Sequence, residues 1–154
     1  MDLLDQNTLV LTTNRYLMVF DVSPTALSPI LLAYTALPET AFRTDLISSQ
    51  GIKRAYVADG RGGLQVYNLS AARSGGGITH EGGLRLTGIS TDVVVVNDFK
   101  AVVAATNVLH IVDTSSFNTM QSACPLFMNT TRVRLYANRL YIGQEYGLKI
   151  YTLP

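Results

Sequence analysis

The chain has 154 residues, of which 47% are hydrophobic and only 15% are charged, and it carries 12 basic and 11 acidic side chains. This composition excludes a disordered polyelectrolyte, and the lack of any basic cluster argues against a nucleic-acid partner. No stretch approaches the roughly 18 apolar residues of a membrane span, and residues 1–5 do not resemble a signal peptide, so we expect neither feature in this chain.

Four related segments follow one another along the chain, at residues 7–21, 54–68, 100–113 and 139–152. Each has an apolar triplet, a short polar or glycine turn, and a strand that begins with leucine. These leucines are spaced by 47, 45 and 39 residues and are Leu17, Leu64, Leu109 and Leu148. A period of about 40 to 50 residues is typical of propeller blades or helical repeats. Helical repeats are excluded because no segment has the apolar spacing of a helix.

Further strands complete each repeat. One is predicted before the triplet, at residues 45–47, 92–96 and 132–136, and an outer one after the pair, at 30–34, at 84–86 and around 124–128. The repeats then cover about 1–40, 41–88, 89–129 and 130–154 of a single domain. This plan of four antiparallel strands per repeat is that of a propeller blade.

The triplets favour a propeller over a sandwich because they are apolar on both faces. Strands of a two-sheet sandwich have one polar face, whereas a blade is covered by a neighbour on each side. We therefore predict an all-β, propeller-like fold of about four blades, with the first and last incomplete. The open ends predict one of three arrangements: a small closed ring, a ring completed by two or more chains, or part of a propeller of about six to eight blades.

Residues 55–70, Ala-Tyr-Val-Ala-Asp-Gly-Arg-Gly-Gly-Leu-Gln-Val-Tyr-Asn-Leu-Ser, resemble the LVIVD-repeat family of bacterial β-propellers. Residues 109–115 and 17–23 keep the same pattern, and the fourth repeat departs from it with Thr152 in place of the usual Asp. The resemblance implies a propeller fold and an extracytoplasmic or cell-surface location. It implies no catalytic residues.

Three charged residues form the main candidate site. Asp45 and Asp92 each follow a threonine at the start of an inner strand, and Arg132 occupies the corresponding place in the fourth repeat. Inner strands line the axial channel of a propeller, so these side chains should gather at one mouth and could hold a cation or a polar ligand. The alternative is that Thr and Asp at the strand starts hydrogen-bond neighbouring turns and tie the blades together.

Other motifs favour structural explanations. Residues 60–63 are interpreted as a hairpin turn, since a strand rather than a helix follows the glycines. His80 falls in a glycine-rich stretch at 74–83 that predicts an exposed loop, and His110 is predicted to be partly exposed. A nucleophilic cysteine needs an adjacent base, and Cys124 is interpreted instead as a buried or idle thiol. We expect no metal site and no cofactor.

Converging ionisable groups of the kind that catalysis requires are scarce in this sequence. The first hypothesis is therefore a non-catalytic interaction or scaffold module that binds protein or another macromolecule, or a second copy of itself. A second is a hydrolase or oxidoreductase of propeller type that uses the axial mouth. A third is a fragment without independent activity.

Overall fold

A computed structural model describes residues 1–115, 117, 120–125 and 129–153, with only the backbone of 120–125 and 131. These residues form four antiparallel sheets, which we number in chain order. Sheet 1 contains β1 (Asp2–Asp5), β2 (Thr8–Thr12), β3 (Tyr16–Asp21) and β4 (Ile30–Ala36). Sheet 2 contains β5 (Arg43–Ser49), β6 (Ile52–Ala58), β7 (Leu64–Asn68) and β8 (Thr79–Leu84), with a short 3₁₀ helix η1 (Ala72–Ser74) before β8.

Sheet 3 contains β9 (Ser90–Asn97), β10 (Lys100–Ala105), β11 (Val108–Asp113) and β12 (Met120–Pro125). Sheet 4 contains β13 (Thr130–Tyr136), β14 (Arg139–Gln144) and β15 (Gly147–Thr152). Within every sheet each strand pairs with the next one along the chain. The prediction of four successive all-β repeats is therefore confirmed, as are the inner strands at 45–47, 92–96 and 132–136 and the outer strand at 30–34.

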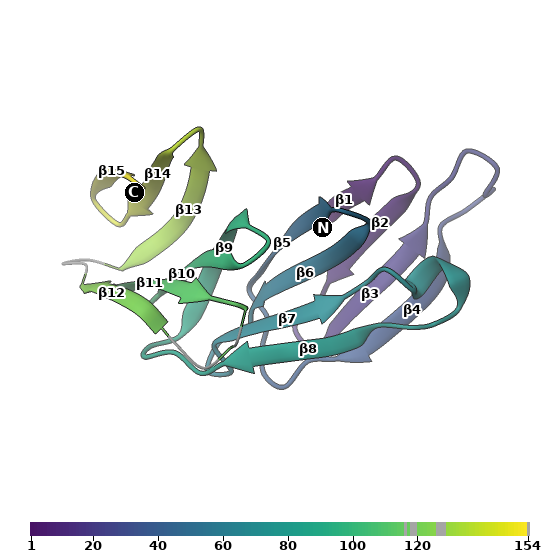
Figure 1. The fold of residues 1–154 in the computed structure, drawn as a ribbon, viewed down its shortest axis with the longest axis horizontal. Helices are drawn as coiled ribbons and strands as arrows, with labels where there is room; N and C mark the ends of the chain where they lie inside the picture. The colour runs from purple at the N-terminus through teal and green to yellow at the C-terminus, as the bar shows by residue number, and fades with distance from the viewer. Residues whose placement is uncertain (116, 118–119, 126–128, 154) are drawn as a thin grey trace.

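The sheets are stacked in chain order. Figure 1 shows them following one another from sheet 1 on the right to sheet 4 at the upper left. The first strand of each sheet contacts the first strand of the next sheet: β1 contacts β5, β5 contacts β9, and β9 contacts β13. Each internal sheet therefore has a neighbour on both sides.

Three apolar clusters form the core, one at each junction between successive sheets. Each draws residues from both partners: Val10, Leu17 and Val57 between sheets 1 and 2, Tyr56, Leu64 and Val103 between sheets 2 and 3, and Val102, Leu109 and Ile142 between sheets 3 and 4. The described residues of sheets 1 and 4 share no such cluster. Triplets 55–57 and 101–103 are accordingly buried throughout, whereas in triplet 9–11 only Val10 is buried.

A backbone hydrogen bond recurs in all four repeats. The residue that follows the third strand donates its N–H to the carbonyl of the residue just before the second strand or at its start. The donor–acceptor pairs are Val22 to Asn7, Leu69 to Lys53, Thr114 to Phe99 and Leu153 to Asn138. These donors are spaced by the same 47, 45 and 39 residues as the strand leucines. The repeat seen in the sequence is therefore a repeat of backbone geometry.

The Asp/Asn-x-Ser motif that ends three of the third strands has a local physical cause. The side-chain oxygens of Asp21, Asn68 and Asp113 accept the N–H of the serine two residues later, at 2.9, 2.9 and 2.8 Å. This turn is one that Asp and Asn favour, because their short side chains can replace a backbone acceptor. The fourth repeat, with Thr152 at this place, departs from the motif.

Two expectations for the outer part of the fold are wrong. Residues 74–83 are not a long loop, since they include the end of η1 and most of β8. The outer strand of sheet 2 is thus β8 at 79–84, rather than 84–86. A Cβ added at Gly83 would meet the amide end of the Gln65 side chain, so the glycine leaves room for this neighbouring side chain.

The two end sheets are smaller, as predicted. β1 has four residues, whereas β5, β9 and β13 have seven, eight and seven. Sheet 4 has three strands among the described residues. Residues 126–128, the second half of the expected outer strand of the third repeat, lie outside the described residues, while 120–125 form β12.

Candidate functional site

The first strands of all four sheets contribute to one cleft. Its volume is about 290 Å³, and it is lined by Asp2 of β1, Arg43 to Asp45 of β5, Val93 to Val95 of β9, and Arg134 and Leu135 of β13. The sheets therefore fan around a common space. Charged groups of both signs reach this space, and it is the place where the sequence predicted a mouth lined by inner strands.

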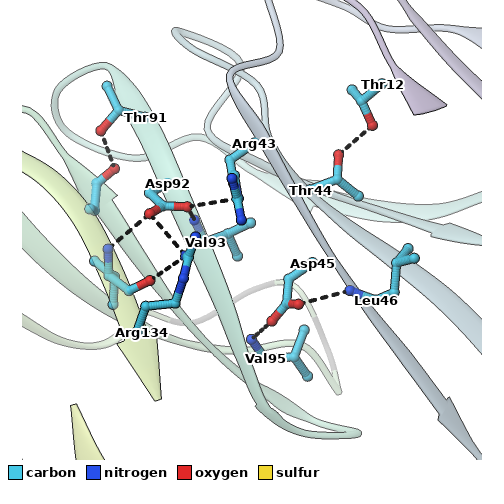
Figure 2. Close-up of polar contacts among 12 residues, drawn as sticks. Thr12, Arg43, Thr44, Asp45, Leu46, Thr91, Asp92, Val93, Val95 and Arg134 are labelled. Carbon is cyan, nitrogen blue, oxygen red and sulfur yellow. Dashed lines mark hydrogen bonds and ion pairs between the residues drawn. The ribbon is translucent and has the colours of Figure 1, made fainter. Parts of the chain in front are cut away.

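Asp92 precedes Val93, a residue that lines the cleft, but Asp92 does not line the cleft itself, and 0% of its surface is exposed. One carboxylate oxygen accepts the N–H of Val93 at 3.0 Å, and the other accepts the N–H of Val133 at 2.8 Å. Arg43 of sheet 2 and Arg134 of sheet 4 lie 3.6 and 3.5 Å from the same carboxylate. Figure 2 shows Asp92 at the centre of these contacts, so this single side chain joins three sheets.

Asp45 makes a similar contact one sheet earlier. Its carboxylate accepts the N–H of Leu46 at 3.1 Å and, across the junction, the N–H of Val95 in β9 at 2.7 Å. Burial raises the pKa of Asp45, and the nearby Asp2 adds to this rise. The two N–H groups and Arg134 lower the pKa but do not outweigh burial.

The strand register places the two aspartates in different rows of the stack. Asp92 is opposite Ala104. The equivalent alanine of sheet 2 is Ala58, but Asp45 is opposite Tyr56, two residues before it. The residue of sheet 2 that corresponds to Asp92 is Arg43, which pairs with Ala58. The shared Thr-Asp sequence therefore occurs at two different positions of the inner strand, which are two residues apart on the same face. Both aspartates face the next sheet.

Arg132 lies apart from the two aspartates. It pairs with Gly143 and thus holds the row of Asp92, as the sequence predicted, but its side chain is exposed and it does not line the cleft. Arg43 and Arg134 are the basic residues that the structure brings to the carboxylates, and sequence reasoning missed both. The available signal was the two-residue period of a strand, because Arg43 is two residues before Asp45 and Arg134 two after Arg132.

The arrangement favours a structural role for the two aspartates. Each carboxylate already accepts one N–H from its own strand and one from the next sheet, so both of its oxygens have a partner within the fold. Thr12 and Thr44 add a hydroxyl contact between sheets 1 and 2 (Figure 2). Every junction thus has a polar tie close to the cleft.

The two histidines have partners within the fold. His110 was predicted to be partly exposed, and this is wrong: it is fully buried, and its Nε2 lies 3.0 Å from the carbonyl oxygen of Thr87 in the connection from sheet 2. His80 is exposed on β8, where it contacts Gln65 at 2.9 Å and the ring of Tyr67 at 4.9 Å between centroids. The side chain of Cys124 lies outside the described residues.

The part of the chain that the structure describes contains no group of three His, Cys, Asp or Glu residues that could hold a metal ion. Among the described residues, no helix has the length and apolar character needed to cross a membrane. Residues 60–63 form the predicted turn between β6 and β7, in which Gly60 and Gly63 have φ of +53° and +82°.

No family model and no curated protein matches this chain. Solved structures do. The crystal structure of the computationally designed Ika4 protein is similar over 97% of this chain and 88% of its own, with 15% identity and a TM-score of 0.65. The crystal structure of BBS1N in complex with ARL6DN, soaked with mercury, is similar over 94% of this chain and 45% of its own, with 13% identity and a TM-score of 0.71.

A lead-soaked crystal of the same complex gives a similar result, with 13% identity and a TM-score of 0.70 over 46% of that chain. This chain thus spans less than half of the length of the chain it matches in the two BBS1N structures. At these identities the similarity concerns the fold alone. The protein has an all-β fold whose successive antiparallel sheets resemble a propeller-like fold.

Proposed function

We propose that this chain is a non-catalytic interaction module built from LVIVD-like propeller repeats, which binds protein through the open faces of its first and last sheets. One observation carries the proposal. The strand leucine of each repeat is 0% exposed in sheet 1, 0% in sheet 2 and 4% in sheet 3, but Leu148 of sheet 4 is 62% exposed. The sequence has an apolar residue at this position, where the described residues of the chain leave it largely uncovered.

The open face of sheet 4 extends beyond Leu148. Directly paired residues of antiparallel strands point to the same face, so Gly143 and Leu148 lie in one row, and Tyr141 and Ile150 lie in the next. Ile150 is 53% exposed, whereas its counterparts Val19 and Val66 are 0% and 1% exposed. A contiguous apolar face of this kind is typical of a protein interface.

Sheet 1 has an open face on its opposite side. Leu3, Leu9, Phe20 and Leu31 are paired in one row across β1, β2, β3 and β4. Leu3 and Leu31, the outermost two, are 64% and 48% exposed. The corresponding row of sheet 2 includes Ala55 and Tyr67, which are buried against sheet 1. Both ends of the stack therefore carry apolar residues suited to packing against another sheet.

The proposal is tested with two variants, Leu148→Glu on the open face of sheet 4 and Leu27→Glu in an exposed loop of sheet 1. Dilute wild-type protein should bind an apolar fluorescent dye. Leu148→Glu should lose much of this binding and Leu27→Glu should keep it, since Leu27 is fully exposed in the connection between β3 and β4 and is not part of a strand. Dye binding that is equal in all three proteins would contradict the proposal. So would turnover of a hydrolase or oxidoreductase substrate that Asp45→Ala abolishes, because the axial mouth would then be catalytic.

A further inference from the structure

The proposed interaction faces belong to one chain but lie at opposite ends of the row of sheets in Figure 1. At each internal junction, the earlier sheet contributes the face that contains its strand leucine. The later sheet contributes the face that is equivalent to the row of Leu3 and Leu9 in sheet 1. Sheet 4 presents the first kind of face and sheet 1 presents the second. The chain thus carries both halves of one further junction, and its described residues do not bring them together.

The charges of the repeats alternate in sign. Residues 1–40 carry four acidic and one basic side chain, and 41–88 carry three acidic and six basic ones. Residues 89–129 carry three acidic and one basic, and 130–154 carry one acidic and four basic. Each repeat is therefore opposite in sign to its neighbours. The basic last repeat and the acidic first repeat would continue the alternation if they met.

Ion pairs at the junctions follow this alternation. Lys53 of sheet 2 contacts Asp5 of sheet 1 at 2.6 Å, and Asp92 of sheet 3 lies between Arg43 of sheet 2 and Arg134 of sheet 4. Opposite charges across an interface favour the correct partner and disfavour like-charged ones. Two last sheets, both basic, would repel each other, as would two acidic first sheets.

From these observations we infer that the occupant of the open faces is a second copy of this chain, bound head to tail, so that sheet 4 of each copy packs on sheet 1 of the other. This inference rests on the proposed function. Two such junctions, related by a two-fold axis, leave no face open. The pair holds eight sheets around one axis, which is within the range of about four to eight blades that propellers use, whereas three copies would exceed it.

The test measures the solution mass of the full chain and of three variants by light scattering across a wide range of concentrations. Wild type and the control Leu27→Glu should have twice the 16.8 kDa mass of one chain. Leu148→Glu changes only the face of sheet 4 and Leu3→Glu only the face of sheet 1, and both should reduce the mass to that of one chain. Both side chains are exposed in the isolated chain, and circular dichroism checks that the variants fold.

Mixing the two variants adds a readout that does not depend on loss of association. The intact sheet 1 of Leu148→Glu can pack on the intact sheet 4 of Leu3→Glu, so the mixture should regain part of the dimer mass. Dissociation by only one of the variants would overturn the head-to-tail arrangement, because it would indicate that two like faces meet. A failure of the mixture to associate would overturn it as well.

The failures of the two proposals are distinguishable. A monomeric wild type that binds apolar dye at Leu148 would overturn the second copy as occupant and leave a protein-binding face in place. A monomeric wild type whose dye binding is unaffected by Leu148→Glu would overturn both. A mass above two chains would overturn the closed pair.

Discussion

Replacing Asp92 by alanine should destabilise the fold markedly, because its carboxylate joins three sheets. The change removes the acceptor of the N–H of Val133, and an unsatisfied buried donor costs about 1 to 3 kcal/mol. Arg43 and Arg134 also lose a partner, but their side chains are 31% and 49% exposed, so water compensates for most of that loss. We expect the free energy of unfolding to fall by about 2 to 3 kcal/mol.

For a chain of this length, 1 kcal/mol shifts the melting temperature by about 2 to 4 °C, so Asp92→Ala should melt about 5 to 10 °C lower. Asp92→Asn keeps an oxygen that can accept one N–H and should lose roughly half as much. The matched control is Asp2→Ala, which removes an exposed carboxylate from the cleft and should change stability by less than about 0.5 kcal/mol. The assay is thermal and urea unfolding followed by circular dichroism.

The opposite result would refute the reasoning. If Asp92→Ala melts no lower than Asp2→Ala, the carboxylate does not tie the sheets together. A ligand-binding role at the axial mouth would then be the better explanation of why Asp92 is kept in a buried position.

Three further changes test local features. Burial opposes ionisation of Asp5, but hydrogen bonds from Lys53 and a backbone N–H lower its pKa to about 2. Asp5→Asn should therefore cost up to about 1 kcal/mol at pH 7, after allowance for exposure, and this cost should shrink as the pH falls below about 4 and disappear only below about 2. Burial raises the pKa of Asp59, whose Oδ1 has no partner among the described residues, so the ionised Asp59 destabilises the folded state at neutral pH and its protonation in acid removes this contribution. Asp59→Asn should be more stable than wild type at pH 7, and the gain should shrink as the pH falls through the raised pKa. Gly63 and Gly75 both have φ of +82°, but a Cβ would lie 2.1 Å from a carbonyl oxygen of β8 at Gly63 and within 4 Å of nothing at Gly75. Gly75→Ala should cost about 1 kcal/mol and Gly63→Ala clearly more, as measured by urea unfolding; equal costs would contradict the close approach.

The central strands could be predicted because their sequence reflects their burial. Residues 55–57 and 101–103 are apolar without alternation, since each triplet is packed between two sheets. The outer strand β8 could not be predicted in the same way. It contains His80, Gly82 and Gly83, residue types that are not typical of strands, and the place that Gly83 leaves for the Gln65 side chain belongs to the neighbouring strand and is not visible in the local sequence.

The site was predicted in outline but not in its contacts. Asp45 and Asp92 do lie at the inner strands, but their offset by one row depends on strand register and on the irregular pairing at the start of β9, which a short Thr-Asp motif does not reveal. His110 was assigned to a partly exposed position because the repeats vary there. In sheet 3 the position is buried, and Nε2 of His110 lies 3.0 Å from the carbonyl oxygen of Thr87 in the connection from sheet 2, a contact that the varied residues of the repeat do not reveal.

The stacking in chain order has a consequence for how the molecule opens. A structure whose units contact only their immediate neighbours approximates a one-dimensional array, in which the stability of each unit is the sum of its own term and the terms of its adjoining interfaces. Sheets 2 and 3 have two such interfaces, and sheets 1 and 4 have one in the isolated chain. Amide protons should therefore exchange in a gradient, fastest in the three-stranded sheet 4 and slowest in β6 and β10, and occupation of the end faces should flatten that gradient.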